Sequence, residues 1–244
     1  MALATWWKGD PLPALAPVPG LTVAVCSDAA LLAEINALDP SEVRARLDAG
    51  HRAYLAALDG VPVAYGWVAT VGAAIGELDL RFALSDRDRY LWDFATLPAY
   101  RGRGIYPRLL QAILAREAQA GAERFWIIHA PENHASAAGI AKAGFQAVSE
   151  LSFHRERGVG SLALDHRERA RVGAAVLGVS LVEAVQAGRV LSPCWRCVMA
   201  ARSGQADHVP CWERDGDAHA CACIVPDRGA QRAGSTGAVA EPGA

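Results

Sequence analysis

Two glycines and two arginines alternate in the segment that joins a predicted strand to a predicted amphipathic helix. They are Arg101, Gly102, Arg103 and Gly104. The glycines let the backbone turn tightly and let a ligand approach main-chain N–H groups without a Cβ in the way. The first turn of the helix adds unpaired N–H groups and the positive end of the helix dipole. We predict that this loop binds a pyrophosphate or a similar anion, with the two guanidinium groups adding full charges.

A plain entry into a helix is the alternative interpretation of this loop. A nucleotide P-loop is excluded, because no Lys-Ser or Lys-Thr pair follows the glycines. A dinucleotide-binding fingerprint is excluded as well, because the glycine spacing differs and the preceding strand is not the first of the chain. Pro107 suits the first helical turn, where its missing N–H has no intrahelical partner to lose.

A second segment with chemical potential begins at Asn133. This residue opens a short helix of small residues, Ser136 lies one turn further on, and Lys142-Ala-Gly144-Phe145 follows. Together the two segments resemble the GNAT N-acetyltransferase superfamily. The run Arg101-Gly-Arg-Gly104-Ile105-Tyr106 is similar to the acyl-CoA pyrophosphate loop of that family, and the second segment is similar to its Asn-led helix. The resemblance covers about residues 21–165.

This resemblance implies a GNAT-like α/β fold with a mixed sheet and acetyl-CoA as cosubstrate. The main chain of Ala95, Thr96 and Leu97 would hydrogen-bond the pantetheine arm like an added strand. The amides from Gly102 to Tyr106 would hold the pyrophosphate, and Asn133 would contact the pantetheine or the amine-bearing side of the site. The reaction implied is direct attack of a neutral amine on the thioester in a ternary complex, with a main-chain N–H holding the developing oxyanion.

Two positions depart from the family pattern. Tyr106 stands where glycine or alanine is usual, and Ile140 stands where many relatives carry the tyrosine that protonates the leaving thiolate. Isoleucine has no proton to give. Three alternatives follow: Ser136 or Tyr106 supplies the proton, the thiolate leaves unassisted, or the domain binds coenzyme A without catalysing the transfer.

The general base is also left open by the sequence. Glu77, Asp79, Tyr90 and Asp93 lie on strands expected to flank the cleft, and strand alternation places Tyr90 and Trp92 on the face opposite Asp93. The resemblance favours the positions of Tyr90 and Trp92, which would make Asp93 a buried structural acid. A chain of water molecules is a further alternative. The candidate catalytic residues are Tyr90, Asp93 and Ser136.

Five cysteines gather in the last fifth of the chain: Cys194, Cys197, Cys211, Cys221 and Cys223. The spacing Cys194-x-x-Cys197 brings two thiolates to one tetrahedral ion. Structural zinc, with His208 and His219 as substitute ligands, is one interpretation of the cluster. Free or redox-active thiols and an iron–sulfur site are the alternatives.

The pattern along the chain predicts four parts: a Pro-rich N-terminal arm over 1–20, an α/β domain over 21–165, a helical and Cys-rich extension over 166–226, and a disordered tail over 227–244. Leu21–Cys26 is expected as the first strand. Further strands are expected at 51–59, 61–71, 77–84, 90–97, 125–128, 145–155 and 161–164. Helices are expected at 28–38, 40–50, 105–121, 133–143 and 166–190. The last of these reads as a packing helix and not as a helix–turn–helix, because the would-be recognition helix over 181–187 carries no basic residue.

Composition narrows the function classes. Of 244 residues, 52% are hydrophobic and 20% charged, which excludes disorder for most of the chain. The net charge of −2 disfavours nucleic acid and anionic membranes as partners, and neither a membrane-spanning run nor a secretory signal is recognised. We expect a cytoplasmic N-acetyltransferase that acts on a small-molecule or peptide amine. The alternative is a non-catalytic CoA- or ligand-sensing module whose Cys-rich tail binds a metal and a partner or DNA. The acceptor and the oligomeric state stay open, with a homodimer as one alternative.

Overall fold

A computed structural model describes residues 1–130, 132–154, 158–164 and 166–182 of the chain. The chain divides into two units, Met1–Leu191 and Ser192–Ala244, and all of the described residues belong to the first. The five clustered cysteines, His208 and His219 therefore lie outside the described residues, as does the expected tail over 227–244.

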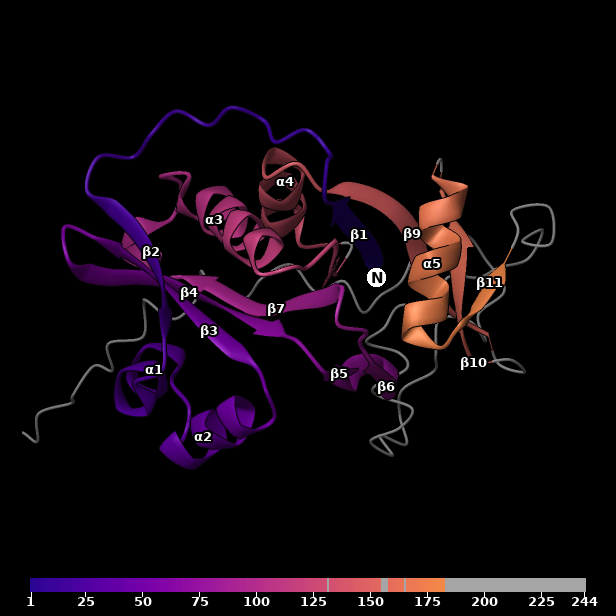
Figure 1. The fold of residues 1–244 in the computed structure, drawn as a ribbon, viewed down its shortest axis with the longest axis horizontal. Coiled ribbons are helices and arrows are strands. Elements are labelled where there is room, and N and C mark those ends of the chain that lie inside the picture. The colour runs from indigo at the N-terminus through magenta and orange to yellow at the C-terminus, as the bar shows by residue number, and fades with distance from the viewer. Residues whose placement is uncertain (131, 155–157, 165, 183–244) are drawn as a thin grey trace, which may run out of the picture. The chain divides into compact units, whose positions relative to one another are not determined.

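A mixed sheet of nine strands forms the centre of the described unit (Figure 1). Its strands in spatial order are β11 (Ser180–Val182), β10 (Gly158–Ala163), β9 (Gln146–His154), β1 (Ala2–Trp7), β8 (Arg124–His129), β7 (Asp88–Thr96), β4 (Val61–Ala69), β3 (Arg52–Leu58) and β2 (Leu21–Cys26). Two short strands, β5 (Gly72–Ile75) and β6 (Leu80–Ala83), pair separately. Among the described strands, β7 runs parallel to β8 and β10 parallel to β11, and the other pairs are antiparallel.

Five α-helices accompany these strands in the described part of the chain. They are α1 (Ala29–Asn36), α2 (Pro40–Asp48), α3 (Ile105–Gln119), α4 (His134–Lys142) and α5 (Arg167–Leu177). Two 3₁₀ turns cover Gly76–Leu78 and Pro98–Tyr100. Within the described ranges, no helix combines the length and the apolar character that crossing a membrane requires. The predicted mixed α/β architecture is confirmed.

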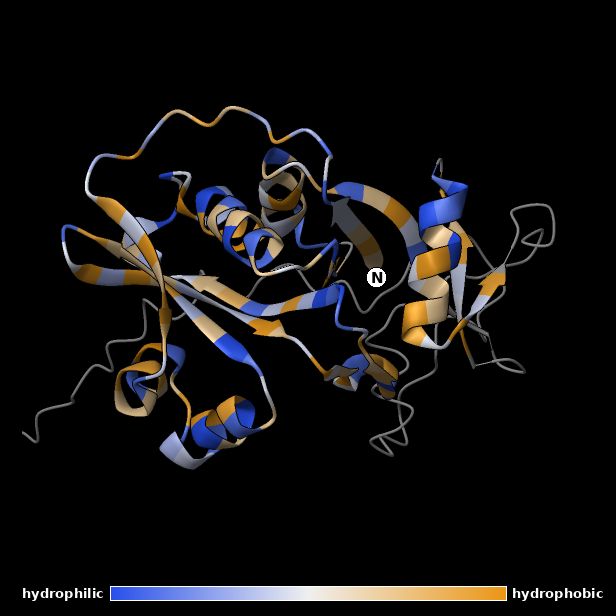
Figure 2. Ribbon diagram, viewed as in Figure 1, coloured by the Kyte–Doolittle hydropathy of each residue, from blue (hydrophilic) through white to orange (hydrophobic). Residues whose placement is uncertain are grey.

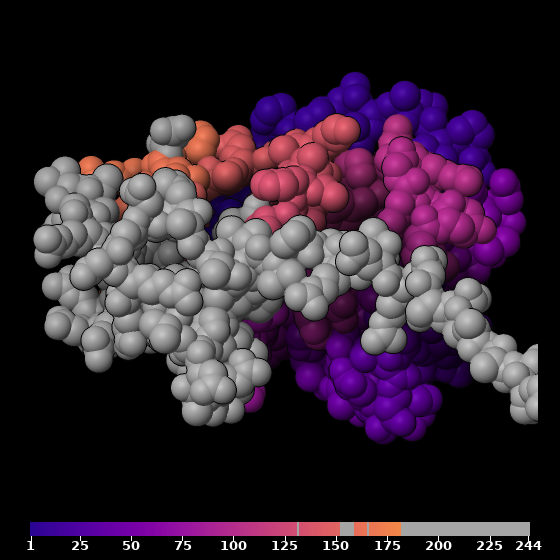
Figure 3. Space-filling model, turned by 180° about the vertical axis from the view of Figure 1, so that it is seen from behind, coloured from indigo at the N-terminus to yellow at the C-terminus, as the bar shows by residue number. Residues whose placement is uncertain are grey.

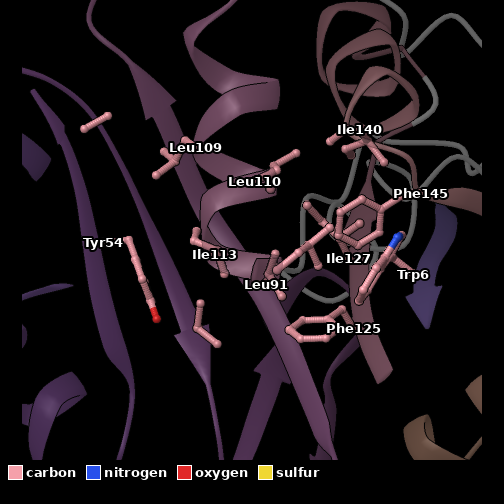
Figure 4. Close-up of a cluster of buried hydrophobic side chains, with 14 of the residues drawn as sticks. Trp6, Tyr54, Leu91, Leu109, Leu110, Ile113, Phe125, Ile127, Ile140 and Phe145 are labelled. Atoms are coloured by element: carbon pink, nitrogen blue, oxygen red, sulfur yellow. The ribbon is translucent and has the colours of Figure 1, made fainter. Parts of the chain in front are cut away.

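The helices cover both faces of the sheet, as strand alternation requires. One face carries Leu91, Phe125 and Ile127 and packs against α3 and α4 in a core that Figure 4 shows with Leu109, Leu110, Ile113 and Ile140. The other face carries Tyr65 and Trp67 beneath α1 and α2, and Leu3 and Trp126 beneath α5. Helix α3 bears both hydrophobic and hydrophilic residues along its length (Figure 2), and its buried residues include Leu109, Leu110, Ile113 and Leu114. Helix α5 is hydrophilic in its first turns and hydrophobic in its last turns (Figure 2).

The first strand of the chain is not where the sequence places it. Ala2–Trp7 pairs antiparallel with β8 on one side and with β9 on the other, so the start of the expected arm is an interior strand. Trp6 is 5% exposed and belongs to the core. The prolines that favour an extended arm begin only at Pro11, and they leave the preceding aromatic and apolar residues free to pair. Leu21–Cys26, expected first, forms the edge strand β2.

The helix expected over 166–190 ends early. Helix α5 stops at Leu177 because Gly178 adopts a left-handed conformation (φ 68°) and closes the helix with hydrogen bonds to Ala174 and Ala175. Ser180–Val182 then forms β11 parallel to β10, where the prediction places a continuation of the helix. The strand expected over 77–84 is shorter than predicted, because the 3₁₀ turn Gly76–Leu78 and its C-cap Asp79 (φ 51°) precede β6.

Candidate active site

The parallel strands β7 and β8 separate halfway along their length. They pair from Asp88 opposite Arg124 to Leu91 opposite Ile127, and both strands then continue without pairing to each other. Each keeps its other neighbour: β4 pairs with β7 as far as Thr96, and β1 pairs with β8 as far as His129. The side of β7 that faces the gap over 92–97 is called the open edge below. Because β8 does not pair with this side, a ligand could lie along it like an added strand. Two main-chain groups in this range already have partners: the Thr96 carbonyl accepts from Arg101, and the Leu97 N–H donates to the Val63 carbonyl of β4 at 2.9 Å.

A β-bulge lies at the point where the strands separate. The register between β4 and β7 shifts between Tyr65 and Trp67, and Asp93 adopts a left-handed conformation with φ 50°. The ring of Phe94 lies against Gly66, where a Cβ would come within 2.0 Å of the ring. A bulge bends its strand and increases its twist, and this bulge therefore accounts for the departure of β7 from β8.

The predicted anion-binding loop connects the open edge to α3. Gly102 (φ 77°) and Gly104 (φ 70°) are both left-handed, and Gly104 occupies the N-cap position of α3 without a side-chain cap. The first-turn N–H groups are thus left for a ligand. Arg101 donates from Nε to the Thr96 carbonyl at 3.0 Å, and the Arg103 guanidinium carbon lies 5.2 Å from the centroid of the Tyr100 ring. Figure 3 shows the magenta atoms of this region at the surface, beside the salmon atoms of α4.

Not every predicted loop residue offers its side chain to a ligand. Ile105 is 1% exposed and packs in the core, so only its main chain is available. Sequence reasoning missed Arg108, one turn into α3, which donates from Nη1 to the Gly104 carbonyl at 2.5 Å and from Nη2 to the Ala16 carbonyl. Arg108 therefore stabilises the loop through Gly104 and links the N-terminal segment to α3 through Ala16.

Helix α4 begins beside α3 at the same end of the sheet. Asn133 is its N-cap, and its side-chain oxygen accepts a hydrogen bond of 3.0 Å from the Ser136 N–H. The Ser136 hydroxyl lies 3.5 Å from the hydroxyl of Tyr106, which reaches across from the first turn of α3. The Tyr106 ring fits there because Gly139 has no Cβ, which would lie 2.3 Å from the ring. Burial raises the pKa of Tyr106 to about 12, against a smaller lowering by the hydrogen bond with Ser136.

Ile140, which stands where the family resemblance implies a tyrosine, is a core residue in the structure. Ile140 is 3% exposed and packs among the core residues of α3 and the sheet (Figure 4). Its side chain serves the hydrophobic core and supplies no polar group. The Tyr106 hydroxyl, held on the neighbouring helix, is the acidic group that the structure places next to Ser136.

Asp93 lies at the start of the open edge and is not a buried acid. Its side chain is 33% exposed, and its Oδ2 atom pairs with Nη1 of Arg46 at 2.5 Å. The expectation of a buried structural acid is therefore wrong, because the bulge turns this residue out of the strand alternation. Arg46, on α2, was missed in the sequence, where its spacing from Glu42 indicates only an ordinary pair on a helix surface.

Tyr90 lies apart from these groups, in the paired part of β7. It is 5% exposed, opposite Trp126 of β8, and its ring packs edge-on against Phe82 at a centroid distance of 5.2 Å. Burial raises its pKa strongly, and the charge of Glu77 adds to that shift. Ser136 thus meets Tyr106 beside the loop, Asp93 lies at the start of the open edge and pairs with Arg46, and Tyr90 packs apart from both with Phe82 and Trp126.

No three histidine, cysteine, aspartate or glutamate side chains gather to hold a metal ion within the ranges that the structure describes. The predicted ligands Cys194, Cys197, Cys211, Cys221 and Cys223 lie beyond those ranges, so zinc stays a prediction.

Residues 27–145 match the family model described as "Acetyltransferase (GNAT) family". The comparison with curated proteins found no match. A solved GCN5-related N-acetyltransferase from Kribbella flavida is 21% identical over 60% of this chain, with a TM-score of 0.40, and this chain spans 53% of it. An aminoglycoside N-acetyltransferase in complex with CoA is 18% identical over 56% of this chain and 99% of its own, with a TM-score of 0.42. An aminoglycoside antibiotic 6'-N-acetyltransferase from Acinetobacter baumannii is 17% identical over 56% of this chain and 97% of its own, with a TM-score of 0.43.

Proposed function

We propose that the chain transfers an acetyl group from acetyl-CoA to the amine of a small molecule or peptide. The match of residues 27–145 to the acetyltransferase (GNAT) family model supports this proposal. One observation carries the proposal. The strands β7 and β8 separate after Leu91 and Ile127, and the open edge leads directly into an uncapped helix N-terminus with two left-handed glycines. A strand-like arm and a pyrophosphate fit these two features in that order.

The residues that would hold acetyl-CoA lie on two adjoining elements. The main chain of Ala95, Thr96 and Leu97 forms the open edge and would pair with the pantetheine arm. The N–H groups from Gly102 to Tyr106 would hold the pyrophosphate, with Arg101 and Arg103 exposed beside them. Asn133 is exposed at the start of α4 and would contact the pantetheine or the amine-bearing side of the site. When bound, the cosubstrate supplies an activated acyl group as a thioester.

Proton transfer in the proposed reaction uses two groups of this chain. The acceptor ammonium must lose a proton before its nitrogen attacks, and the exposed Asp93 carboxylate at the start of the open edge receives it and passes it to solvent. A C–N bond forms, the C–S bond breaks, and the nitrogen loses its second proton to solvent. The departing sulfur takes a proton from Tyr106, which Ser136 positions, and the phenolate regains a proton from solvent. The high pKa of Tyr106 keeps its phenol protonated at neutral pH. Tyr90 has no role in this scheme.

The buried position of Ile140 favours a second candidate function. A chain without the usual acid at this position can serve as a CoA-sensing module that binds its ligand and transfers nothing. The two functions share the open edge and the loop. They differ in whether thiol is released when an amine is added to the loaded protein.

Calorimetric titration with acetyl-CoA tests the binding site. Gly102→Val places a side chain at φ 77° in the loop, and Gly60→Val does the same at φ 83° in the turn between β3 and β4; neither added Cβ meets an atom within 4 Å. The two variants therefore carry the same kind of backbone strain, about 1–3 kcal/mol each. Gly102→Val should weaken acetyl-CoA binding at least tenfold, whereas Gly60→Val should leave it within twofold.

Two results would contradict this proposal. If wild-type protein does not bind acetyl-CoA, the proposed binding site is wrong. If the two glycine variants bind acetyl-CoA with equal affinity, the loop is not part of the binding site. Thiol release with a panel of amines then separates the two candidate functions. Binding of acetyl-CoA without turnover on any amine would favour the sensing module.

A further inference from the structure

A cation of the protein itself occupies a cluster of two indoles and two carboxylates next to the bulge. The Arg46 guanidinium pairs with Asp93 at 2.5 Å and with Glu42 at 2.8 Å. Its central carbon lies 4.6 Å from the centroid of the Trp92 ring and 5.2 Å from that of Trp67. These five residues are called the indole–carboxylate cluster below. Carboxylates and the faces of indole rings both attract cations, so the cluster is built to recognise positive charge.

The charge of the cluster is not balanced. One guanidinium faces two carboxylates, which leaves a net charge of −1. His51 adds no positive charge at neutral pH: its Nδ1 atom accepts a hydrogen bond of 3.0 Å from Nε1 of Trp92, and burial, with a contribution from Arg46, lowers its pKa. Tyr65 stays neutral as well, because burial and the charge of Asp93 raise its pKa.

Asp93 connects this cluster to the open edge. Its Oδ2 atom is held by Arg46, while Oδ1 makes no hydrogen bond among the residues that the structure describes. The side chain is twice as exposed as that of Arg46, at 33% against 15%. Asp93 itself belongs to the first residues of the open edge, two positions before Ala95, where the main chain proposed to hold the acyl donor begins.

We infer that the acceptor is a cationic amine whose ammonium group binds Oδ1 of Asp93, and that acceptors carrying a carboxylate are repelled. This inference rests on the proposed function, whose acyl donor sets the place where the amine must arrive. Glu42 and Asp93 give the entering molecule a negative field, and the Arg46 guanidinium is already paired with both carboxylates. An acidic acceptor would meet this net negative charge and would have to compete with both carboxylates for Arg46. The substrate class is therefore a small molecule or peptide with net positive charge.

The test uses two ligands of equal carbon number that differ at one end, 1,5-diaminopentane and 5-aminopentanoate. Each is titrated calorimetrically into wild-type protein, with and without saturating CoA, so that no turnover is needed. The diamine should bind at least tenfold more tightly than the amino acid, and its affinity should fall as salt is raised. Asp93→Asn should weaken diamine binding at least tenfold, because an ion pair with a charged hydrogen bond is lost.

Asp48→Asn is the matched control. It removes the same charge from an exposed position on α2 and should change diamine binding less than twofold. Equal binding of the two ligands, tighter binding of the amino acid, or no binding of the diamine would each overturn the inference, even if Asp93→Asn failed to fold. Loss of acetyl-CoA binding by wild-type protein would instead overturn the proposed function, and the two failures are therefore distinguishable.

Discussion

The hydroxyl oxygen of Tyr106, in the first turn of α3, lies 3.5 Å from that of Ser136, in the first turn of α4. The two side chains meet across the end of the sheet at which β7 and β8 have separated. Gly139 makes room for the phenol ring, and Phe94 of the bulge lies 5.6 Å from it, centroid to centroid. A bulky residue at a position where the family usually has a small one thus places an acidic hydroxyl between the two helices of the site.

Tyr106→Phe keeps the ring and removes the proton. We expect thiol release in the presence of amine to fall about 10²-fold or more, the range of general acid catalysis, with acetyl-CoA affinity within threefold. Tyr100→Phe is the control, because its ring also supports the loop through Arg103 and carries no proposed proton. Since the pKa of Tyr106 is about 12, wild-type activity should show no decline from this group between pH 7 and pH 9. If the two variants have equal activities, Tyr106 does not supply the proton to the departing thiolate.

Glu117 is the buried charge on which α3 and the sheet depend. It is 1% exposed and accepts hydrogen bonds from Arg89 at 2.9 Å, from Arg52 at 2.7 Å and from Tyr54 at 2.6 Å. Glu117→Gln leaves Arg89 buried with no opposing charge, and we expect a loss of about 3–5 kcal/mol in the free energy of unfolding, measured by urea denaturation. Glu123→Gln, at the exposed pair with Arg87, should cost less than about 1 kcal/mol.

The same carboxylate gives stability a defined pH dependence. Burial alone would raise the pKa of Glu117, but hydrogen bonds from Tyr54, Arg89 and Arg52 outweigh it, and the folded-state pKa lies below the ordinary value of 4.5. The unfolded state therefore takes up this proton first as pH falls. The contribution of Glu117 is fully present above pH 4.5 and is lost as the pH falls through the folded-state pKa. Glu117→Gln should lack this part of the acid-induced loss, and an unchanged profile would contradict the assignment.

Trp6→Ala tests whether the N-terminal segment is part of the core. Trp6 is 5% exposed and packs edge-on against Phe125 at a centroid distance of 5.5 Å, so truncation should cost about 3–5 kcal/mol. Leu12→Ala, in the Pro-rich segment, removes a side chain that is 42% exposed and should cost less than about 1 kcal/mol. Thermal unfolding of both variants measures the difference. Similar stabilities would show that residues 2–7 do not form an interior strand in solution.

Local chemistry accounts for the elements that could be predicted from the sequence. Helix α3 follows from the apolar spacing of Leu109, Leu110 and Ile113, and the turn before it follows from two glycines that tolerate positive φ. The family match over 27–145 confirms what the motifs at Arg101 and Asn133 predicted. Each of these signals lies within one or two turns of chain, where the residues that cooperate are also neighbours in sequence.

Long-range pairing accounts for what could not be predicted. Ala2–Trp7 is a strand because β8 and β9 offer it two edges, although both lie more than a hundred residues away along the chain. The same applies to Asp93: the family resemblance implies a buried acid at this position, but the shifted register opposite Tyr65 and Trp67 turns the side chain out toward Arg46. A register shift is set by the partner strand and leaves no mark on the residues that it moves.

The sequence by itself determined the glycine turn at 101–104, the two helices beside it and the match of residues 27–145 to the GNAT acetyltransferase family model, because glycine conformations, helix periodicity and motif spacing act over a few residues. Only the tertiary structure decided which side chains complete the site. Tyr106 meets Ser136, and Arg46 meets Asp93, through contacts between elements that are distant in sequence. Such contacts arise when whole faces are buried against one another, and that burial is a property of the assembled sheet.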